Sequence, residues 1–111
     1  MIKRVYVAGP YTKGDVVINV RNACEAGTKL VEAGYSAFVP HLSHLWHTVT
    51  PRPWSFWMNI DYEWLTVCHY LLRLPGESTG ADLEVEAAKA AGIPCFFGTA
   101  EEFILAHADK Q

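Results

Sequence analysis

Glu84 stands out among the acidic residues because it falls on the inner side of an expected helix. At 100° per residue, Asp82, Glu86 and Lys89 gather on one face of the helix expected over residues 80–91. Glu84 lies on the opposite face. The rest of that face consists of small residues that suit close packing on a sheet: Ala81, Ala87, Ala88 and Ala91.

A carboxylate on such a face is costly to bury unless it has polar partners or a chemical role. Glu84 comes early in its helix, where the positive end of the helix dipole favours the ionised form. An ionised carboxylate that faces a pocket can act as a nucleophile. The alternative is a structural glutamate that reaches solvent past the alanines or binds nearby backbone donors.

Asp61 is the second acid on an apolar face. In the helix expected over residues 55–68, it falls between Trp57, Leu65 and Cys68, away from the polar side of that helix. The alternative is a buried aspartate held by hydrogen bonds. Together with Glu84 it suggests the paired carboxylates of glycosyl chemistry, in which one attacks the anomeric carbon and a protonated partner assists the leaving group.

The order of the expected elements predicts how these acids are positioned. Short apolar runs, which we interpret as buried strands, alternate with helical patterns that begin at capping residues and end at glycines. The strands are expected over residues 5–8, 35–39, 70–74 and 93–97, and the helices over 16–33, 55–68, 80–91 and 100–107. The stretch 41–54 shows no clear period.

This alternation predicts an α/β fold: a flavodoxin-like or Rossmann-like three-layer domain over residues 1–111, with a short parallel sheet of four to five strands. Ligands of such sheets bind at the carboxyl ends of the strands. The expected site is therefore built from the loops after Ala8, Val39, Leu74 and Phe97.

Two of these loops could bind an anion. Residues 75–80 combine free backbone N–H groups, the hydroxyls of Ser78 and Thr79, and a helix N-terminus that includes Gly80. An ordinary helix cap is the alternative. The loop over residues 9–14 matches neither the dinucleotide fingerprint nor the P-loop, so no organic cofactor is expected.

Histidines and aromatic residues cluster around the second strand end. His41, His44 and His47 recur at intervals of three without a metal-binding signature, so we expect no metal and place one or two of them, His41 foremost, at the pocket mouth. A stacking face for a nucleobase could come from five aromatic residues, of which Tyr11 and Trp46 are favoured. The other three are Tyr6, Trp54 and Trp57.

Composition narrows the class of protein. The net charge of -3 argues against a nucleic-acid polymer as the partner. Three cysteines without a CxxC pair indicate reduced thiols, and we expect a cytoplasmic protein. No apolar segment reaches the length needed to span a membrane, so no membrane association is expected.

Three segments resemble the nucleoside 2-deoxyribosyltransferase superfamily: YVAGPY over residues 6–11, DYEWL over 61–65 and STGADLE over 78–84. Their spacing is most similar to the 2'-deoxynucleoside 5'-phosphate N-hydrolases, and the chain also resembles a small bacterial and phage branch of unknown function.

The resemblance implies that Glu84 is the nucleophile and Asp61 its acid partner. It implies that Ser78 and Gly80 hold a 5'-phosphate while Gly9 and its neighbours line the sugar. It also implies a homodimer or larger homo-oligomer, and we expect the segment over residues 41–57 in or beside the interface.

The sequence therefore predicts an N-glycosidase-type hydrolase, or a transferase, that cleaves the base–sugar bond of a nucleoside or its 5'-monophosphate. A non-catalytic nucleotide-binding or sensor module is the rival hypothesis. An oligomeric scaffold is a third, suggested by the dense aromatic residues between Trp46 and Trp64.

Overall fold

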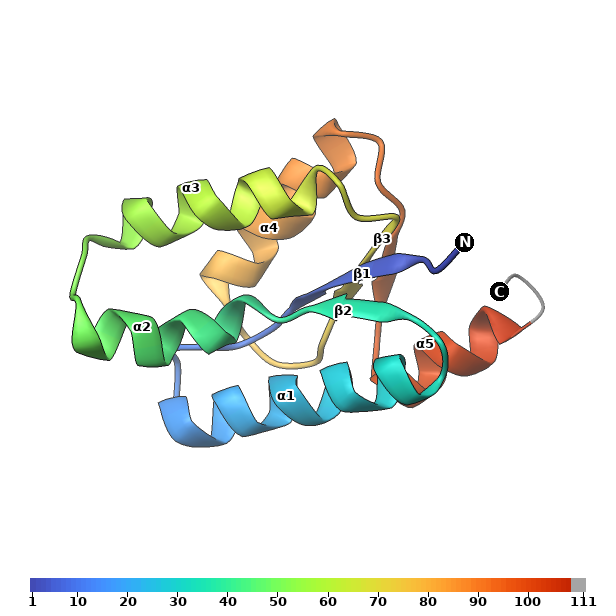
Figure 1. Ribbon diagram of the computed structural model, residues 1–111, viewed down its shortest axis with the longest axis horizontal. Helices are drawn as coiled ribbons and strands as arrows, with labels where there is room; N and C mark the ends of the chain where they lie inside the picture. The colour runs from blue at the N-terminus through green and yellow to red at the C-terminus, as the bar shows by residue number, and fades with distance from the viewer. Residues whose placement is uncertain (109–111) are drawn as a thin grey trace.

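The computed structural model describes residues 1–108, which form a four-stranded parallel sheet between two layers of helices (Figure 1). The strands are β1 (Arg4–Ala8), β2 (Ser36–Phe38), β3 (Tyr70–Arg73) and β4 (Cys95–Phe97), in the spatial order β2-β1-β3-β4. The helices are α1 (Val16–Glu32), the 3-10 turn η1 (Pro40–Leu42), α2 (Ser43–Val49), α3 (Trp54–Leu65), α4 (Thr79–Ala90) and α5 (Ala100–Ala106).

The expected α/β fold with a parallel sheet is confirmed, and the sheet has four strands. Every strand pair is parallel, and β1 lies between β2 and β3 with Tyr6 beside both Phe38 and Leu71. Residues 5–8 are completely buried, because β1 is central and covered on both faces.

Each face of the sheet has its own core. Val5, Val7 and Leu72 point to the layer of α1 and α5, where Leu30 and Phe103 are completely buried. The alternate residues of β1, Tyr6 and Ala8, point to the layer of α3 and α4. The alternation along one strand therefore decides which residues of β1 face the helices that carry Asp61 and Glu84.

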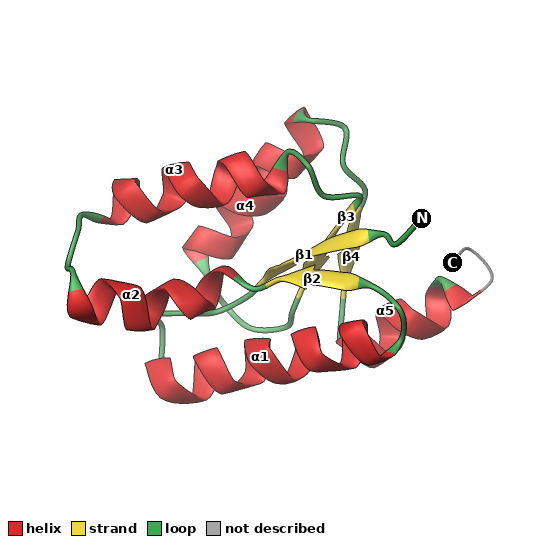
Figure 2. Cartoon of the chain, in the orientation of Figure 1, coloured by secondary structure: helices red, strands yellow, loops and turns green. Residues whose placement is uncertain are grey.

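Figure 2 shows where the helices begin and end, and capping side chains fix the starts of α1, α4 and α5. Asp15 accepts hydrogen bonds from the backbone of Val17 and Ile18 at the start of α1. Ser78 caps α4 by accepting from the Ala81 N–H, and Thr99 forms a capping box with Glu102 at the start of α5. These side chains satisfy backbone donors that have no partner inside the helix.

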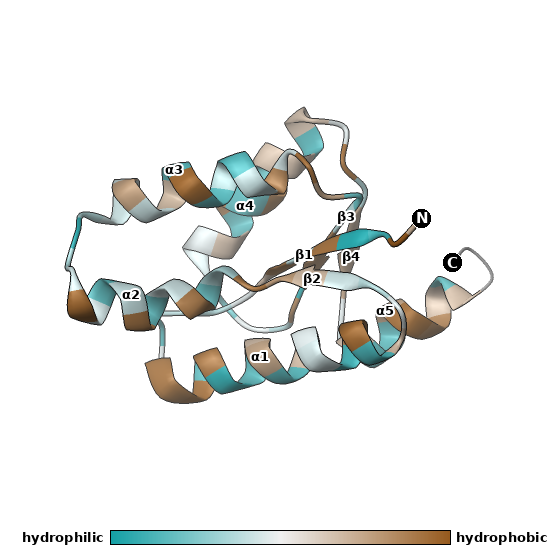
Figure 3. Cartoon of the chain, in the orientation of Figure 1, coloured by the Kyte–Doolittle hydropathy of each residue, from teal (hydrophilic) through white to brown (hydrophobic). Residues whose placement is uncertain are grey.

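The segment over residues 41–54, for which the sequence showed no period, is not irregular in the structure. It contains most of η1 and the whole of α2, and it ends at the first residue of α3. No residue of α2 is buried, although hydrophobic positions recur along it (Figure 3). The helical period was hidden because α2 does not pack on the sheet, so its apolar residues need not keep to one inward face.

Among residues 1–108 no helix is long and apolar enough to cross a membrane. All three cysteines are free thiols, although only Cys68 is fully buried.

The turn between β3 and α4 depends on Gly76. Its φ of 115° is unfavourable for other residues, and an added Cβ would lie 2.7 Å from Cγ of Pro10. Gly92 also has a positive φ, of 74°, but a Cβ there would meet nothing within 4 Å. An alanine at position 92 would therefore suffer backbone strain alone, whereas an alanine at position 76 would suffer backbone strain and a steric clash.

We expect Gly92→Ala to cost about 1–2 kcal/mol of unfolding free energy through backbone strain alone. Gly76→Ala should cost at least about 1 kcal/mol more, because the loop carrying Pro10 must also move. Urea unfolding of the two variants measures this difference, and equal losses would contradict the importance of the Pro10 contact.

Candidate active site

A cleft of about 580 Å³ opens at the carboxyl ends of the strands, on the side of the sheet covered by α3 and α4. Its walls are the loop after β1, the segment η1–α2, one side of α3 and the N-terminal part of α4. Seven of the nine predicted site residues line it: Gly9, Tyr11, His41, Asp61, Ser78, Gly80 and Glu84.

The two acids reach this cleft from different helices. Glu84 lies on the face of α4 that carries Ala81, Val85 and Ala88, and Asp61 lies beside Leu65 on the inner face of α3. The side chains are only 6% and 7% exposed, respectively. The helical periodicity therefore correctly predicted that both carboxyls point inward, and both line one cavity.

Tyr6 provides the only hydrogen bond to Glu84 within residues 1–108: its hydroxyl donates to Oε2 of the carboxyl. Tyr6 is completely buried on β1, and burial followed by the charge of Glu84 raises the pKa of its phenol far above the ordinary value. The hydroxyl therefore keeps its proton and acts as a fixed donor. No hydrogen-bond donor reaches Asp61 within the same described residues.

Burial raises the pKa of both carboxyls. The pKa of Asp61 is raised to about 7 by desolvation. That of Glu84 is raised to about 8 by desolvation and by the charge of Asp61, against the opposing effects of the Tyr6 hydroxyl and the Arg73 cation. The expectation that the helix dipole keeps Glu84 ionised is therefore wrong for the ligand-free protein, because desolvation outweighs it.

Around neutral pH the pair consequently passes through a state with one proton and one negative charge. Because two close carboxyls resist double ionisation, the singly protonated state belongs to the pair as a unit. The hydrogen bond from Tyr6 favours the charge on Glu84, since a donated hydrogen bond stabilises a carboxylate more than a neutral acid. This state is the one that a nucleophile and an acid partner require.

Two predicted ligand contacts lie elsewhere. Tyr6 is below the floor of the cleft and touches Glu84 instead of lining the cavity. Trp46 lies outside the lining residues, half exposed on α2, with its ring at 5.0 Å from that of Trp57. The residue spacing could not show that α2 turns Trp46 outward, because α2 itself was not predicted.

Trp57 and Trp54 from α3 line the cleft together with Tyr11 and form its aromatic wall. Histidines hold this wall in place. The Trp57 indole N–H donates to Nδ1 of His47 at 2.9 Å, and the Tyr11 hydroxyl is 2.8 Å from Nδ1 of His44. One or two histidines were expected at the mouth of the pocket, and His41, His44 and His47 all line the cleft.

The opposite wall is the start of α4. Because Ser78 caps the helix, its oxygen accepts from Ala81, while its own hydroxyl proton remains available to a ligand. The space around the Cα of Gly80 is open, so a ligand can approach the backbone there closely. The helix N-terminus adds a partial positive charge on this side of the cleft.

Arg73 is a functional candidate that sequence reasoning missed. It is 7% exposed at the end of β3, forms an ion pair with Asp82 at 3.0 Å and lowers the pKa of Glu84. The only sequence signal for Arg73 was its position inside an apolar strand.

No group of three or more His, Cys, Asp or Glu side chains within residues 1–108 is arranged to hold a metal ion.

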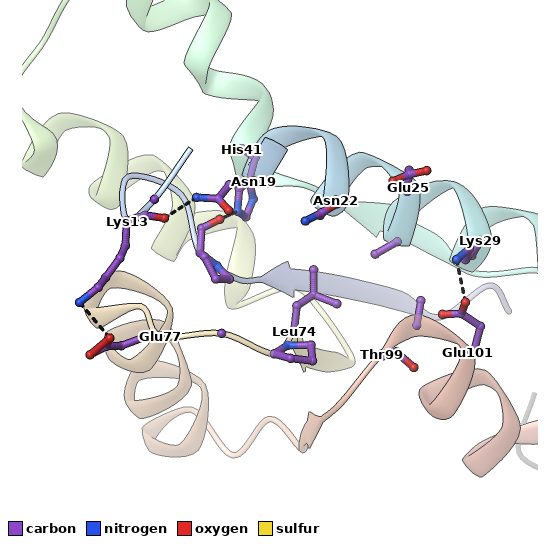
Figure 4. A pocket seen from close by; sticks show the side chains of 16 residues that line it. Lys13, Asn19, Asn22, Glu25, Lys29, His41, Leu74, Glu77, Thr99 and Glu101 are labelled. Atoms are coloured by element: carbon purple, nitrogen blue, oxygen red, sulfur yellow. Dashed lines mark hydrogen bonds and ion pairs between the residues drawn. The ribbon is translucent and has the colours of Figure 1, made fainter. Parts of the chain in front are cut away.

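A second cavity, of about 570 Å³, lies across the same strand ends on the side of α1 and α5 (Figure 4). Ion pairs cross it from Lys13 to Glu77 and from Lys29 to Glu101. His41 lines both cavities, so the loop after β1 and its neighbours form a partition between them. Asp61 and Glu84 line only the first cavity.

Residues 3–97 match a family described as a domain of unknown function, DUF4406. The chain belongs to this family. No curated protein matches the sequence.

Among solved structures, the DUF4406 chain is similar to a 2-deoxyribosyltransferase from the psychrotolerant bacterium Bacillus psychrosaccharolyticus. The TM-score is 0.64 at 18% identity, over 85% of this chain and 70% of the other. The fold is therefore the flavodoxin-like fold of 2-deoxyribosyltransferases, as the resemblance of the three segments implied.

The raised pKa values predict how stability depends on pH. The ordinary values are 3.8 and 4.5, so between about pH 4 and pH 8 the folded protein holds more protons than the unfolded chain. The stabilisation is complete below the ordinary values and is lost as the pH rises through the folded-state values. Glu84→Gln removes the contribution of Glu84, because an amide does not titrate.

We expect the unfolding free energy of the original protein, relative to Glu84→Gln, to fall by at least about 2 kcal/mol between pH 5 and pH 9. Urea unfolding at both pH values measures it. Glu86→Gln, on the exposed face of the same helix, is the matched control and should show no such difference. A pH-independent difference for Glu84→Gln would contradict the assigned shift.

Proposed function

We propose that this protein is an N-glycosidase-type enzyme that cleaves the base–sugar bond of a nucleoside or its 5'-monophosphate, with Glu84 and Asp61 as catalytic residues. One observation carries the proposal: two buried carboxyls that titrate near neutral pH line one cleft, and a buried tyrosine binds one of them. A purely structural pair would be costly, since neither acid has an ion-pair partner within residues 1–108.

In the first step, an oxygen of the Glu84 carboxylate forms a bond to C1' of the sugar while the bond from C1' to the base nitrogen breaks. The electron pair of that bond leaves with the base, which takes the proton of the Asp61 carboxyl. In the second step, a water molecule gives its proton to Asp61 and its oxygen to C1', which releases Glu84. The cycle consumes one water and restores both carboxyls without a cofactor or metal.

Tyr6 supports this division of roles. Its hydroxyl donates to Glu84, which orients the attacking carboxyl and favours its charged form. In the ligand-free protein the pKa of Glu84, about 8, lies above that of Asp61, about 7. The proposed reaction requires the reverse order once substrate is bound, with the charge on Glu84 beside its Tyr6 donor and the proton on Asp61, which lacks such a donor within residues 1–108.

The two walls of the cleft support the proposed substrate class. Trp54, Trp57 and Tyr11 offer flat surfaces to a nucleobase. The start of α4, with Ser78 and Gly80, offers donors to a 5'-phosphate or a sugar hydroxyl. When a second base replaces water in the second step, the same site performs a transfer, as the name of the similar 2-deoxyribosyltransferase describes for that protein. We assign this chemistry to the cytoplasm, where free thiols such as these are ordinary.

We expect Glu84→Gln to abolish release of free base from a panel of nucleosides and monophosphates, because an amide cannot form the glycosyl ester. The bound ligand should be retained, and the free energy of unfolding should be unchanged or higher at neutral pH. Chromatography of released base, isothermal titration and thermal melts measure these three properties. Glu86→Gln should resemble the original protein in all of them.

Base release by Glu84→Gln at the original rate would contradict the nucleophile, and so would a loss of about 1–3 kcal/mol of stability through mismatched buried donors. Ligand binding by the original protein without any release would instead support the sensor hypothesis. Adding a second free base to the same assay separates hydrolysis from transfer.

We also propose that the chain forms a homodimer through the α2–α3 apolar surface. This surface consists of exposed hydrophobic side chains on η1, α2 and α3: Leu42, Leu45, Trp46, Val49, Trp54 and Phe56. Six exposed hydrophobic side chains within residues 42–56 are more than solvent exposure of single residues on a monomer would lead us to expect. It adjoins the aromatic wall of the cleft, since Trp54 belongs to both.

Light scattering at micromolar concentration should give at least twice the mass of one chain. Val49→Glu should convert the assembly to monomers, because a carboxylate would be buried at the interface. Val17→Glu, which changes a similarly exposed valine on α1, should leave the mass unchanged. A monomeric original protein would contradict the dimer.

A further inference from the structure

His41 is the most deeply buried histidine of the chain, with 5% of its surface exposed. Its Nε2 lies 3.2 Å from the carbonyl oxygen of Gly9 and 2.9 Å from that of Pro10. Its other ring nitrogen, Nδ1, is buried and has no hydrogen-bond partner among residues 1–108. The ring also contacts Tyr11 edge-on at 5.9 Å. One side chain therefore contacts three successive residues of the loop after β1.

These contacts fix the tautomer of His41. Carbonyl oxygens only accept hydrogen bonds, so Nε2 must carry the proton and donate to both. The unpaired Nδ1 is then an acceptor, which is less costly to bury alone than an N–H. Burial lowers the pKa of the imidazole, against the raising effect of the two carbonyls, which is consistent with a neutral ring.

We propose that His41 is a positioning residue that holds the Gly9–Pro10 turn against η1 and so fixes the wall of the reaction cleft. The proposal deepens the proposed function and rests on it for the effect on turnover. His41 was expected to bind the ligand itself, whereas the geometry gives its only donor to the backbone of the turn.

We call the contact of His41 with the Gly9 and Pro10 carbonyls the His41 clamp. It also sets the orientation of the peptide bond between Pro10 and Tyr11. The peptide bonds are trans, so the N–H of Tyr11 points away from the Pro10 carbonyl and hence away from His41. That N–H has no acceptor within residues 1–108 and belongs to a residue that lines the cleft. Holding the Pro10 carbonyl therefore also fixes the direction of this unpaired backbone donor.

Pro10 is held from its other side as well. Its ring packs so closely on Gly76 that a Cβ there would lie 2.7 Å from Cγ of the proline. The same loop is tied to the β3–α4 turn by the ion pair between Lys13 and Glu77, at 2.9 Å. Of these three attachments the His41 contact is the most buried, since its hydrogen bond to Gly9 is buried and that to Pro10 is partly buried, so water competes with it least.

Three variants test the clamp. His41→Gln places an amide N–H near the position of Nε2, His41→Asn places an amide near the position of Nδ1, and His41→Leu offers no donor. NMR of the ligand-free original protein at pH 7.5 should show His41 neutral with the proton on Nε2. The Tyr11 and Thr12 amide signals should shift or broaden in the Leu and Asn variants and return toward their original positions in the Gln variant.

In turnover assays per folded protein, the Leu and Asn variants should lose about 10- to 100-fold in kcat/KM, and the Gln variant should recover most of that loss. A proton on Nδ1, or better activity of Asn than Gln, would overturn the proposal in favour of a direct ligand contact. Equal activity or equal loss in all three variants would also overturn it. The NMR experiment needs no substrate. It therefore tests whether His41 holds the turn even when the original protein releases no base.

Discussion

The burial of the Glu84 carboxyl against Tyr6 is the constraint on which the rest of the site depends. A glutamate on the inner face of α4 loses its hydration, and the phenol of Tyr6 replaces part of it with one fixed hydrogen bond. That bond requires a tyrosine on the central strand and a small-residue helix above it. Ala81 and Ala88 meet this requirement by letting α4 lie close to β1.

The same close packing sets the chemistry of the pair. Because α3 and α4 share one face of the sheet, the carboxyls of Asp61 and Glu84 line the same cleft, and desolvation raises the pKa of both into the neutral range. An exposed pair of carboxyls would be doubly ionised and could not provide an acid. The close packing of α3 and α4 on the sheet therefore also keeps one of the two carboxyls protonated near neutral pH.

Sequence periodicity was sufficient for the two acids because each lies on a regular helix that packs on the sheet. The inward direction of Glu84 and Asp61 follows from 3.6 residues per turn and needs no knowledge of the partner. The contact of Tyr6 with Glu84 joins residues 78 positions apart, and nothing local encodes it. The place of Trp46 outside the cleft lining was hidden for a related reason: α2 has no buried residue, so no contact with the sheet imposes a pattern on it.

The strand order explains why the cleft and the second cavity share a partition. β1 leads to α1 on one face and β3 leads to α4 on the other, so their carboxyl ends diverge and leave a space on each side of the two loops. Those loops touch where Pro10 meets Gly76, and His41 reaches the partition from the end of β2. Three neighbouring strands therefore each contribute one residue to the partition. This arrangement fixes the backbone of the cleft wall on which the paired carboxyls also lie.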